Sequence, residues 1–138
     1  NATLATTVAG LGGLDLACVY YAMTGGSYLM GAAREAEVVA GFAAAGTTFV
    51  PAGAAIRAAL AAVGAERVAL VSPYPDWLTQ AAEAYWTAGG LDVVAVGKVP
   101  TGPGGIYGLA SGEVLDVVRV WSRTDPTRWC SAGRGCRR

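Results

Sequence analysis

A run of small and hydroxyl-bearing residues follows the first strongly apolar stretch of the chain and could hold an anion. The run is AMTGGSY at positions 22–28. The hydroxyls of Thr24 and Ser27 can donate hydrogen bonds, and Gly25 lets a ligand approach the backbone N–H groups closely. Carboxylate oxygens accept such bonds, so the run is compatible with a carboxylate-binding turn. A turn that only connects two elements would have the same composition.

A second loop, SPYPD at positions 72–76, holds one tyrosine between two prolines. Because proline fixes its own φ angle, the phenol of Tyr74 should be held rigidly at the end of a strand. From there it can donate a short hydrogen bond to an oxyanion. The alternative is a packing tyrosine, with Asp76 capping the next helix. A third loop, TGPGGIY at 101–107, has the composition of an exposed connection.

The composition excludes several kinds of site. The chain has no histidine, which removes Ser-His and Cys-His nucleophile pairs and most zinc sites. Its three cysteines, Cys18, Cys130 and Cys136, form no disulfide framework or metal-binding spacing, and we expect Cys18 to be a buried core residue. Ten basic residues balance ten acidic ones, so net charge gives no argument for nucleic acid or a membrane surface as a partner. We expect neither a metal nor a cofactor.

Strands and helices alternate along the chain, which indicates an α/β protein whose parallel sheet has helices on both faces. The hydrophobic patterns predict strands at 15–23, 47–50, 67–72 and 91–99, and helices at 1–10, 32–45, 52–63, from the 73–76 turn to about 88, and 111–121. In such a sheet, ligands bind beyond the carboxyl ends of the strands. Both candidate loops fall at such ends.

The chain changes character after Asp125. Its last twelve residues, TRWCSAGRGCRR, carry four arginines and two cysteines where a strand is expected. One interpretation is a shifted reading frame. If the last base of each codon is read with the first two bases of the next codon, Trp129-Cys130 gives a valine codon. The other interpretation is a genuine basic tail.

The sequence predicts three parts of the chain. Residues 1–50 form the end of a first α/β domain, residues 51–124 form the start of a second α/β domain, and residues 125–138 form an anomalous tail.

The two loops and their surroundings resemble the maleate isomerase and arylmalonate decarboxylase branch of the aspartate/glutamate racemase superfamily. The most specific stretch is RVALVSPYP at 67–75, and the Thr-x-x-Ser-Tyr turn at 24–28 lies at the expected distance upstream. The resemblance extends over residues 4–121. It implies a two-domain racemase-like fold with the active site between the domains. Each domain of such a fold carries one catalytic position, usually a cysteine, at the end of a strand.

By this resemblance the first catalytic position falls on Met23. The groups that bind the substrate carboxylate fall on Thr24, through its hydroxyl and N–H, on Gly25, through its N–H, and on Tyr74, through its phenol. Ser27 is a further candidate contact from the same turn. A methionine thioether can neither attack a double bond nor take a proton from carbon, so thiol-dependent isomerisation does not carry over intact.

The resemblance implies a small mono- or dicarboxylate substrate, isomerised or decarboxylated without a cofactor through an enediolate-like state. The alternative is a carboxylate-binding or catalytically inactive truncated relative without the catalytic cysteines. No apolar run reaches the roughly 18 residues of a membrane span and the start lacks a signal pattern, so we expect a cytoplasmic protein. The N-terminal strand and the closing strands of the family fold are absent from this chain, and a second copy could cover the sheet edges left open, which would make a homo-oligomer.

Overall fold

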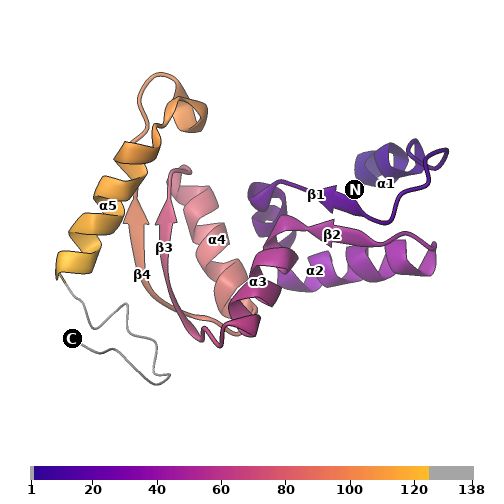
Figure 1. Ribbon diagram of the computed structural model, residues 1–138, viewed down its shortest axis with the longest axis horizontal. Coiled ribbons are helices and arrows are strands. Elements are labelled where there is room, and N and C mark those ends of the chain that lie inside the picture. The colour runs from indigo at the N-terminus through magenta and orange to yellow at the C-terminus, as the bar shows by residue number, and fades with distance from the viewer. Residues whose placement is uncertain (1, 125–138) are drawn as a thin grey trace.

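The computed structural model describes residues 2–124, which form a mixed α/β structure with two small parallel sheets (Figure 1). The predicted tail, 125–138, lies outside the described residues. Within them, the helices are α1 (Ala2–Ala9), α2 (Thr24–Ala44), α3 (Ala52–Ala62), α4 (Asp76–Ala88) and α5 (Ser111–Thr124), and the strands are β1 (Val19–Tyr21), β2 (Phe49–Pro51), β3 (Arg67–Ser72) and β4 (Asp92–Lys98). None of the described helices is both long enough and apolar enough to cross a bilayer.

The β3–β4 sheet agrees closely with the sequence prediction. The two strands are parallel, in a register that runs from Arg67 opposite Asp92 to Ser72 opposite Lys98. Helix α4 packs against β4 and α5 against β3, and Figure 1 shows them on opposite sides of the sheet. Cover on both faces explains why RVALVS is almost continuously apolar.

The β1–β2 sheet differs from the prediction. Instead of one sheet there are two separate sheets, and β1 is three residues long where a strand over 15–23 was expected. Strand β1 pairs only along the three residues of β2, from Val19 opposite Phe49 to Tyr21 opposite Pro51. Without a longer partner the preceding apolar residues stay outside the ladder. Cys18 is among them and is exposed, so its expected core position was wrong.

Helix α2 begins earlier than predicted. The residues 24–27, interpreted from the sequence as a turn, form its first helical turn. The helix is interrupted at Gly31, whose φ of 74° lies in the left-handed region that glycine adopts easily. This kink explains why the helical pattern in the sequence starts only at residue 32.

The core joins α2 to α4 and so connects the two sheets. Its buried members are Tyr28, Leu78, Ala82, Tyr85 and Trp86. The ring of Tyr28 lies edge-on to those of Tyr85 and Trp86, with centroids 5.6 and 5.8 Å away. Such edge-to-face pairs stabilise beyond the apolar area they bury. The division of the chain at residues 50 and 51 stays a prediction.

A buried polar network lies beside this core. The Tyr85 phenol donates a hydrogen bond to Glu35 Oε2, and Arg57 of α3 approaches the same oxygen at 3.4 Å. The Arg57 guanidinium also lies over the Tyr85 ring, 5.2 Å from its centroid. Because burial of a charge is costly without partners, this network holds α2, α3 and α4 in one arrangement.

Candidate functional site

Thr24 and Tyr74, 50 residues apart in the sequence, meet through their hydroxyls. Thr24 Oγ1 lies 3.0 Å from the Tyr74 phenol oxygen, and the contact is partly buried. Thr24 begins α2 just after β1, and Tyr74 follows β3. The structure therefore brings together two residues that the sequence analysis had placed at the carboxyl ends of different strands.

The loop that carries Tyr74 is fixed by two buried hydroxyls. Ser72 Oγ and Thr79 Oγ1 are 2.8 Å apart, and the side chains are almost fully buried. The N–H of Tyr74 donates to Ser72 Oγ at 3.3 Å, and Thr79 Oγ1 donates to the Tyr74 carbonyl at 3.1 Å. Both backbone polar groups of Tyr74 are thus held by side chains at the end of β3 and the start of α4.

Lys98, at the end of β4, is a residue of this region that the sequence analysis missed. Its Nζ donates to the carbonyl of Tyr74 and, at 3.0 Å, to Thr79 Oγ1. It also forms an ion pair with Asp76 Oδ1 at 3.1 Å. Lys98 is the next-to-last residue of the strand predicted at 91–99, and the rule that placed the two loops at strand ends could have found it.

Asp76 does not have the capping role considered from the sequence. Helix α4 has Pro75 as its N-cap, with no side-chain capping hydrogen bond. A proline has no side-chain oxygen that could accept a hydrogen bond from the N–H groups of the first turn. Asp76 lies one position further, inside the first turn, where its carboxylate pairs with Lys98 instead.

Gly25 and Met23 lie on either side of Thr24 at the start of α2. Met23 is the N-cap of α2 and makes no side-chain capping hydrogen bond. Its thioether therefore accepts no hydrogen bond from the N–H groups of the first helical turn, which include that of Gly25. Gly25 is buried, whereas Met23 is 54% exposed and accepts a hydrogen bond from the Tyr21 phenol at 3.3 Å. The α2 terminus thus presents backbone donors beside the Thr24 hydroxyl.

Ser27 faces a different neighbour. Its side chain is fully buried and its Oγ accepts a hydrogen bond from the backbone N–H of Gly53 at 3.1 Å. This bond joins α2 to the start of α3. In the structure Ser27 links two helices, and its contact with a substrate stays a prediction.

Tyr28 is a further residue next to the pair. It lies one helical turn after Thr24, and its ring meets that of Tyr74 edge-on at 6.2 Å. Burial raises the pKa of the Tyr28 phenol and Tyr74 raises it further, while hydrogen bonds with Thr24 and Trp86 lower it. The Tyr28 ring therefore packs as a largely buried neutral phenol next to Tyr74.

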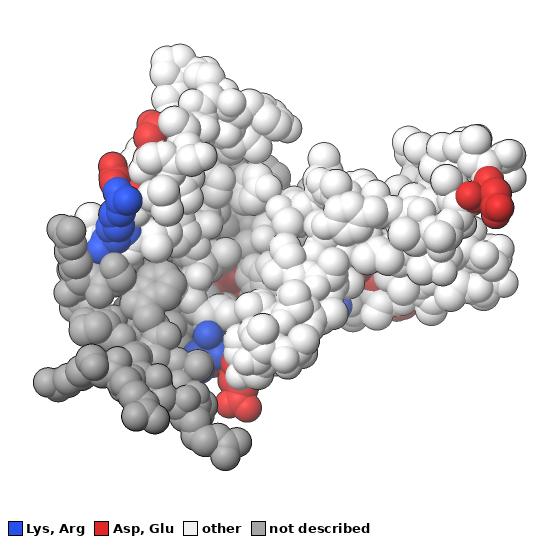
Figure 2. All heavy atoms as spheres, in the orientation of Figure 1, with Lys and Arg blue, Asp and Glu red and all other residues white. Residues whose placement is uncertain are grey.

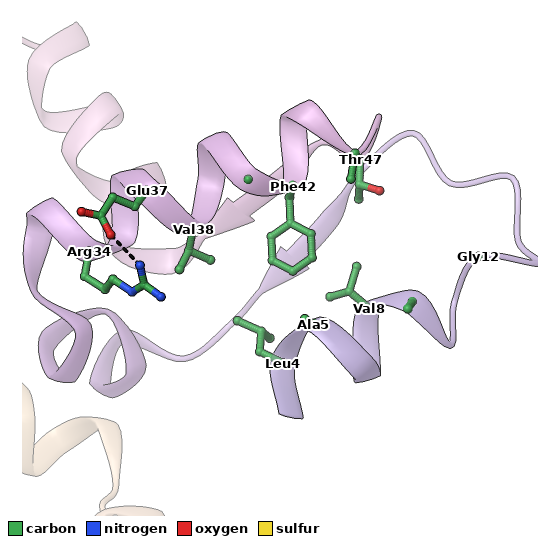
Figure 3. Close-up of a pocket in the computed structure, with 12 residues that line it drawn as sticks. Leu4, Ala5, Val8, Gly12, Arg34, Glu37, Val38, Phe42 and Thr47 are labelled. Atoms are coloured by element: carbon green, nitrogen blue, oxygen red, sulfur yellow. Dashed lines mark hydrogen bonds and ion pairs between the residues drawn. The ribbon is translucent and has the colours of Figure 1, made fainter. Parts of the chain in front are cut away.

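Two hollows that border α1 lie apart from this pair. One, of about 600 Å³, lies between α1 and α2; its apolar lining includes Val8 and Phe42, and the Arg34–Glu37 ion pair also borders it (Figure 3). The other, of about 620 Å³, lies between α1 and β1. Neither is lined by Thr24 or Tyr74. The face seen in Figure 2 carries few charges and is hollowed between the region of β3, β4 and α5 and the region of α1.

The arrangement supports binding through hydroxyls and backbone N–H groups. In residues 2–124 no group of three or more histidine, cysteine or acidic side chains converges in a way that could hold a metal ion. No protein family, curated protein or solved structure matches this chain.

Proposed function

We propose that Thr24, Gly25 and Tyr74 bind a carboxylate of a small mono- or dicarboxylate. The observation that supports this is the 3.0 Å approach of the Thr24 and Tyr74 hydroxyls, beside the first turn of α2, whose N–H groups receive no side-chain cap from Met23. Without ligand, one hydroxyl donates to the other. With a carboxylate in front of the pair, both hydroxyls can turn their protons to its oxygens, and hydrogen bonds to a charged acceptor are stronger than the neutral bond that they replace.

The same donors suit the chemistry of the maleate isomerase and arylmalonate decarboxylase branch, which the sequence resembles. Loss of carbon dioxide or a proton next to a carboxylate moves negative charge onto the carboxylate oxygens and gives an enediolate-like state. Fixed hydroxyl and N–H donors stabilise that charge more than they stabilise the substrate. In this proposal Thr24 and Tyr74 hold the developing oxyanion, and the anchored backbone of Tyr74 keeps its phenol in place.

A second candidate is carboxylate binding without turnover. Met23 favours it, because the position that the resemblance gives to a catalytic cysteine holds an exposed thioether. A thioether supplies no proton and no nucleophile strong enough for addition to a double bond. Cys18, five positions earlier in the sequence, lies outside the α2 terminus that carries the proposed donors.

One experiment tests the proposal and separates the two candidates. Malonate and phenylmalonate binding would be measured by titration calorimetry, and phenylmalonate decarboxylation and maleate isomerisation by proton NMR. Binding with carbon dioxide release or fumarate formation supports the enzyme, and binding without either supports the carboxylate-binding protein. If neither diacid binds, the proposed site is wrong in both forms.

A further inference from the structure

We infer that Lys98 is a positioning residue of the proposed carboxylate site, acting through the main chain of Tyr74. Its ammonium group bonds the carbonyl of Tyr74 rather than standing free in solvent. Any effect of Lys98 on ligand affinity depends on the proposed function. Its effect on the position of Tyr74 does not, and the two can be measured separately.

A count of hydrogen atoms shows that the four groups form one consistent network. Thr79 has a single hydroxyl proton, which it donates to the Tyr74 carbonyl. The contact between Ser72 and Thr79 must then be donated by Ser72, whose oxygen remains free to accept from the Tyr74 N–H. Lys98 supplies two of its three protons, to the Tyr74 carbonyl and to Thr79 Oγ1. Without Lys98, no other group of this network has a second proton to give that carbonyl.

The bond from Lys98 to Thr79 is better protected from solvent than the ion pair with Asp76. The Asp76 side chain is 87% exposed, so solvent screens its attraction to Lys98. Thr79 is buried, and a hydrogen bond from a charged donor in a less polar environment is stronger. Lys98 therefore acts mainly as a link from the end of β4 to the loop that follows β3.

This link sets the position of the Tyr74 phenol. Pro75 restricts the backbone conformation of Tyr74, so the Tyr74 carbonyl cannot rotate freely and a shift of it is passed on to the rest of the residue. The phenol, which the loop after β3 carries, must stay near the Thr24 hydroxyl on α2 for both to reach one carboxylate. Lys98 thus connects the β3–β4 sheet to the geometry of a site that it does not itself touch.

The test compares Lys98→Met, Lys98→Arg and a control, Arg67→Met, in the full chain. Arg67 is also basic and lies at the opposite end of the same sheet, in an exposed ion pair with Asp92. The first readout is the ring-carbon NMR signal of labelled Tyr74, assigned with Tyr74→Phe and measured without ligand. We expect Lys98→Met to shift or broaden it, Lys98→Arg to restore most of it, and Arg67→Met to leave it unchanged.

The second readout is the malonate dissociation constant, which we expect Lys98→Met to raise about tenfold. An unchanged Tyr74 signal in folded Lys98→Met overturns the inference. A shifted signal in a protein that binds no malonate, even as wild type, keeps Lys98 as a positioning residue and refutes the proposed function alone. If Lys98→Met does not fold, as judged by circular dichroism, Lys98→Leu, which also has no donor, takes its place and the same two criteria apply.

Discussion

The phenol of Tyr85 lies 2.5 Å from Oε2 of Glu35, and this hydrogen bond joins α4 to α2 inside the protein. Both side chains are almost fully buried, and the other carboxylate oxygen of Glu35 has no hydrogen-bond partner among the described residues. Glu35 thus depends on Tyr85 and Arg57 for compensation of a buried charge. The proposed site lies at the start of the same two helices, so their mutual position matters for it.

Removal of the Tyr85 hydroxyl should therefore destabilise the fold. We expect Tyr85→Phe to lower the free energy of unfolding by about 1–3 kcal/mol, because it leaves a buried carboxylate oxygen without its short donor. Urea unfolding followed by circular dichroism measures the change. Tyr107→Phe is the matched control, since Tyr107 is 94% exposed. Equal stability of the two variants would show that the Glu35 bond contributes nothing.

Alkaline pH should destabilise the protein through the same group. Burial raises the pKa of Tyr85 first, and its hydrogen bond to Glu35 raises it further; burial also raises the pKa of Tyr28. A folded pKa above the unfolded value of about 10 means that this stability is complete below about pH 10 and is lost as pH rises above it.

Ultraviolet absorbance of tyrosinate, recorded with circular dichroism along an alkaline titration, tests this. We expect Tyr28 and Tyr85 to ionise only as helical signal is lost, and Tyr85→Phe to remove one of these late ionisations. If every tyrosine ionises while the circular dichroism signal is intact, the burial argument for both residues fails.

Gly53 should tolerate no side chain. A Cβ atom there would lie 2.4 Å from the Tyr85 phenol oxygen and 2.7 Å from Ser27 Cβ. We expect Gly53→Ala to cost about 1–3 kcal/mol of stability, since it forces three packed elements apart. Gly41→Ala is the control, because its Cβ would meet nothing within 4 Å and alanine favours a helix interior by about 1 kcal/mol. Thermal unfolding of both variants compares them, and a Gly53→Ala protein as stable as Gly41→Ala contradicts the packing.

The sequence predicted the β3–α4–β4 region well because its signals are local. The apolar run Arg67–Ser72 and the prolines after it mark a strand and the start of a helix without reference to the rest of the chain. The β1 region was predicted poorly, since the length of a strand depends on the partner beside it, and β2 offers only three residues. The helical residues before Gly31 were missed because Thr24-Gly25-Gly26-Ser27 has the composition of a turn, whereas the predicted helix 32–45 matches the part of α2 that follows the break at Gly31.

The candidate site was predictable in part for the same reason. Thr24 and Tyr74 each lie at a strand end, which the alternation of elements indicates. That their hydroxyls meet depends on the packing of α2 against α4, which no local pattern contains. Lys98 was missed because an exposed lysine at the end of a strand has the same appearance in a sequence whether it is solvated or bonded to a carbonyl.

A double-mutant cycle on Thr24 and Tyr74 tests the proposed carboxylate site directly. A hydrogen bond to a charged group contributes roughly 1.5–3 kcal/mol, so Thr24→Val and Tyr74→Phe should each weaken malonate binding by about 10- to 100-fold. Because the two hydroxyls lie 3.0 Å apart and address one ligand, their effects should not add, and the double variant should lose less than the sum. Tyr20→Phe, at an exposed tyrosine of β1, serves as the control. Strictly additive losses would mean that the two hydroxyls act on separate groups, and unchanged affinity in both single variants would remove the site.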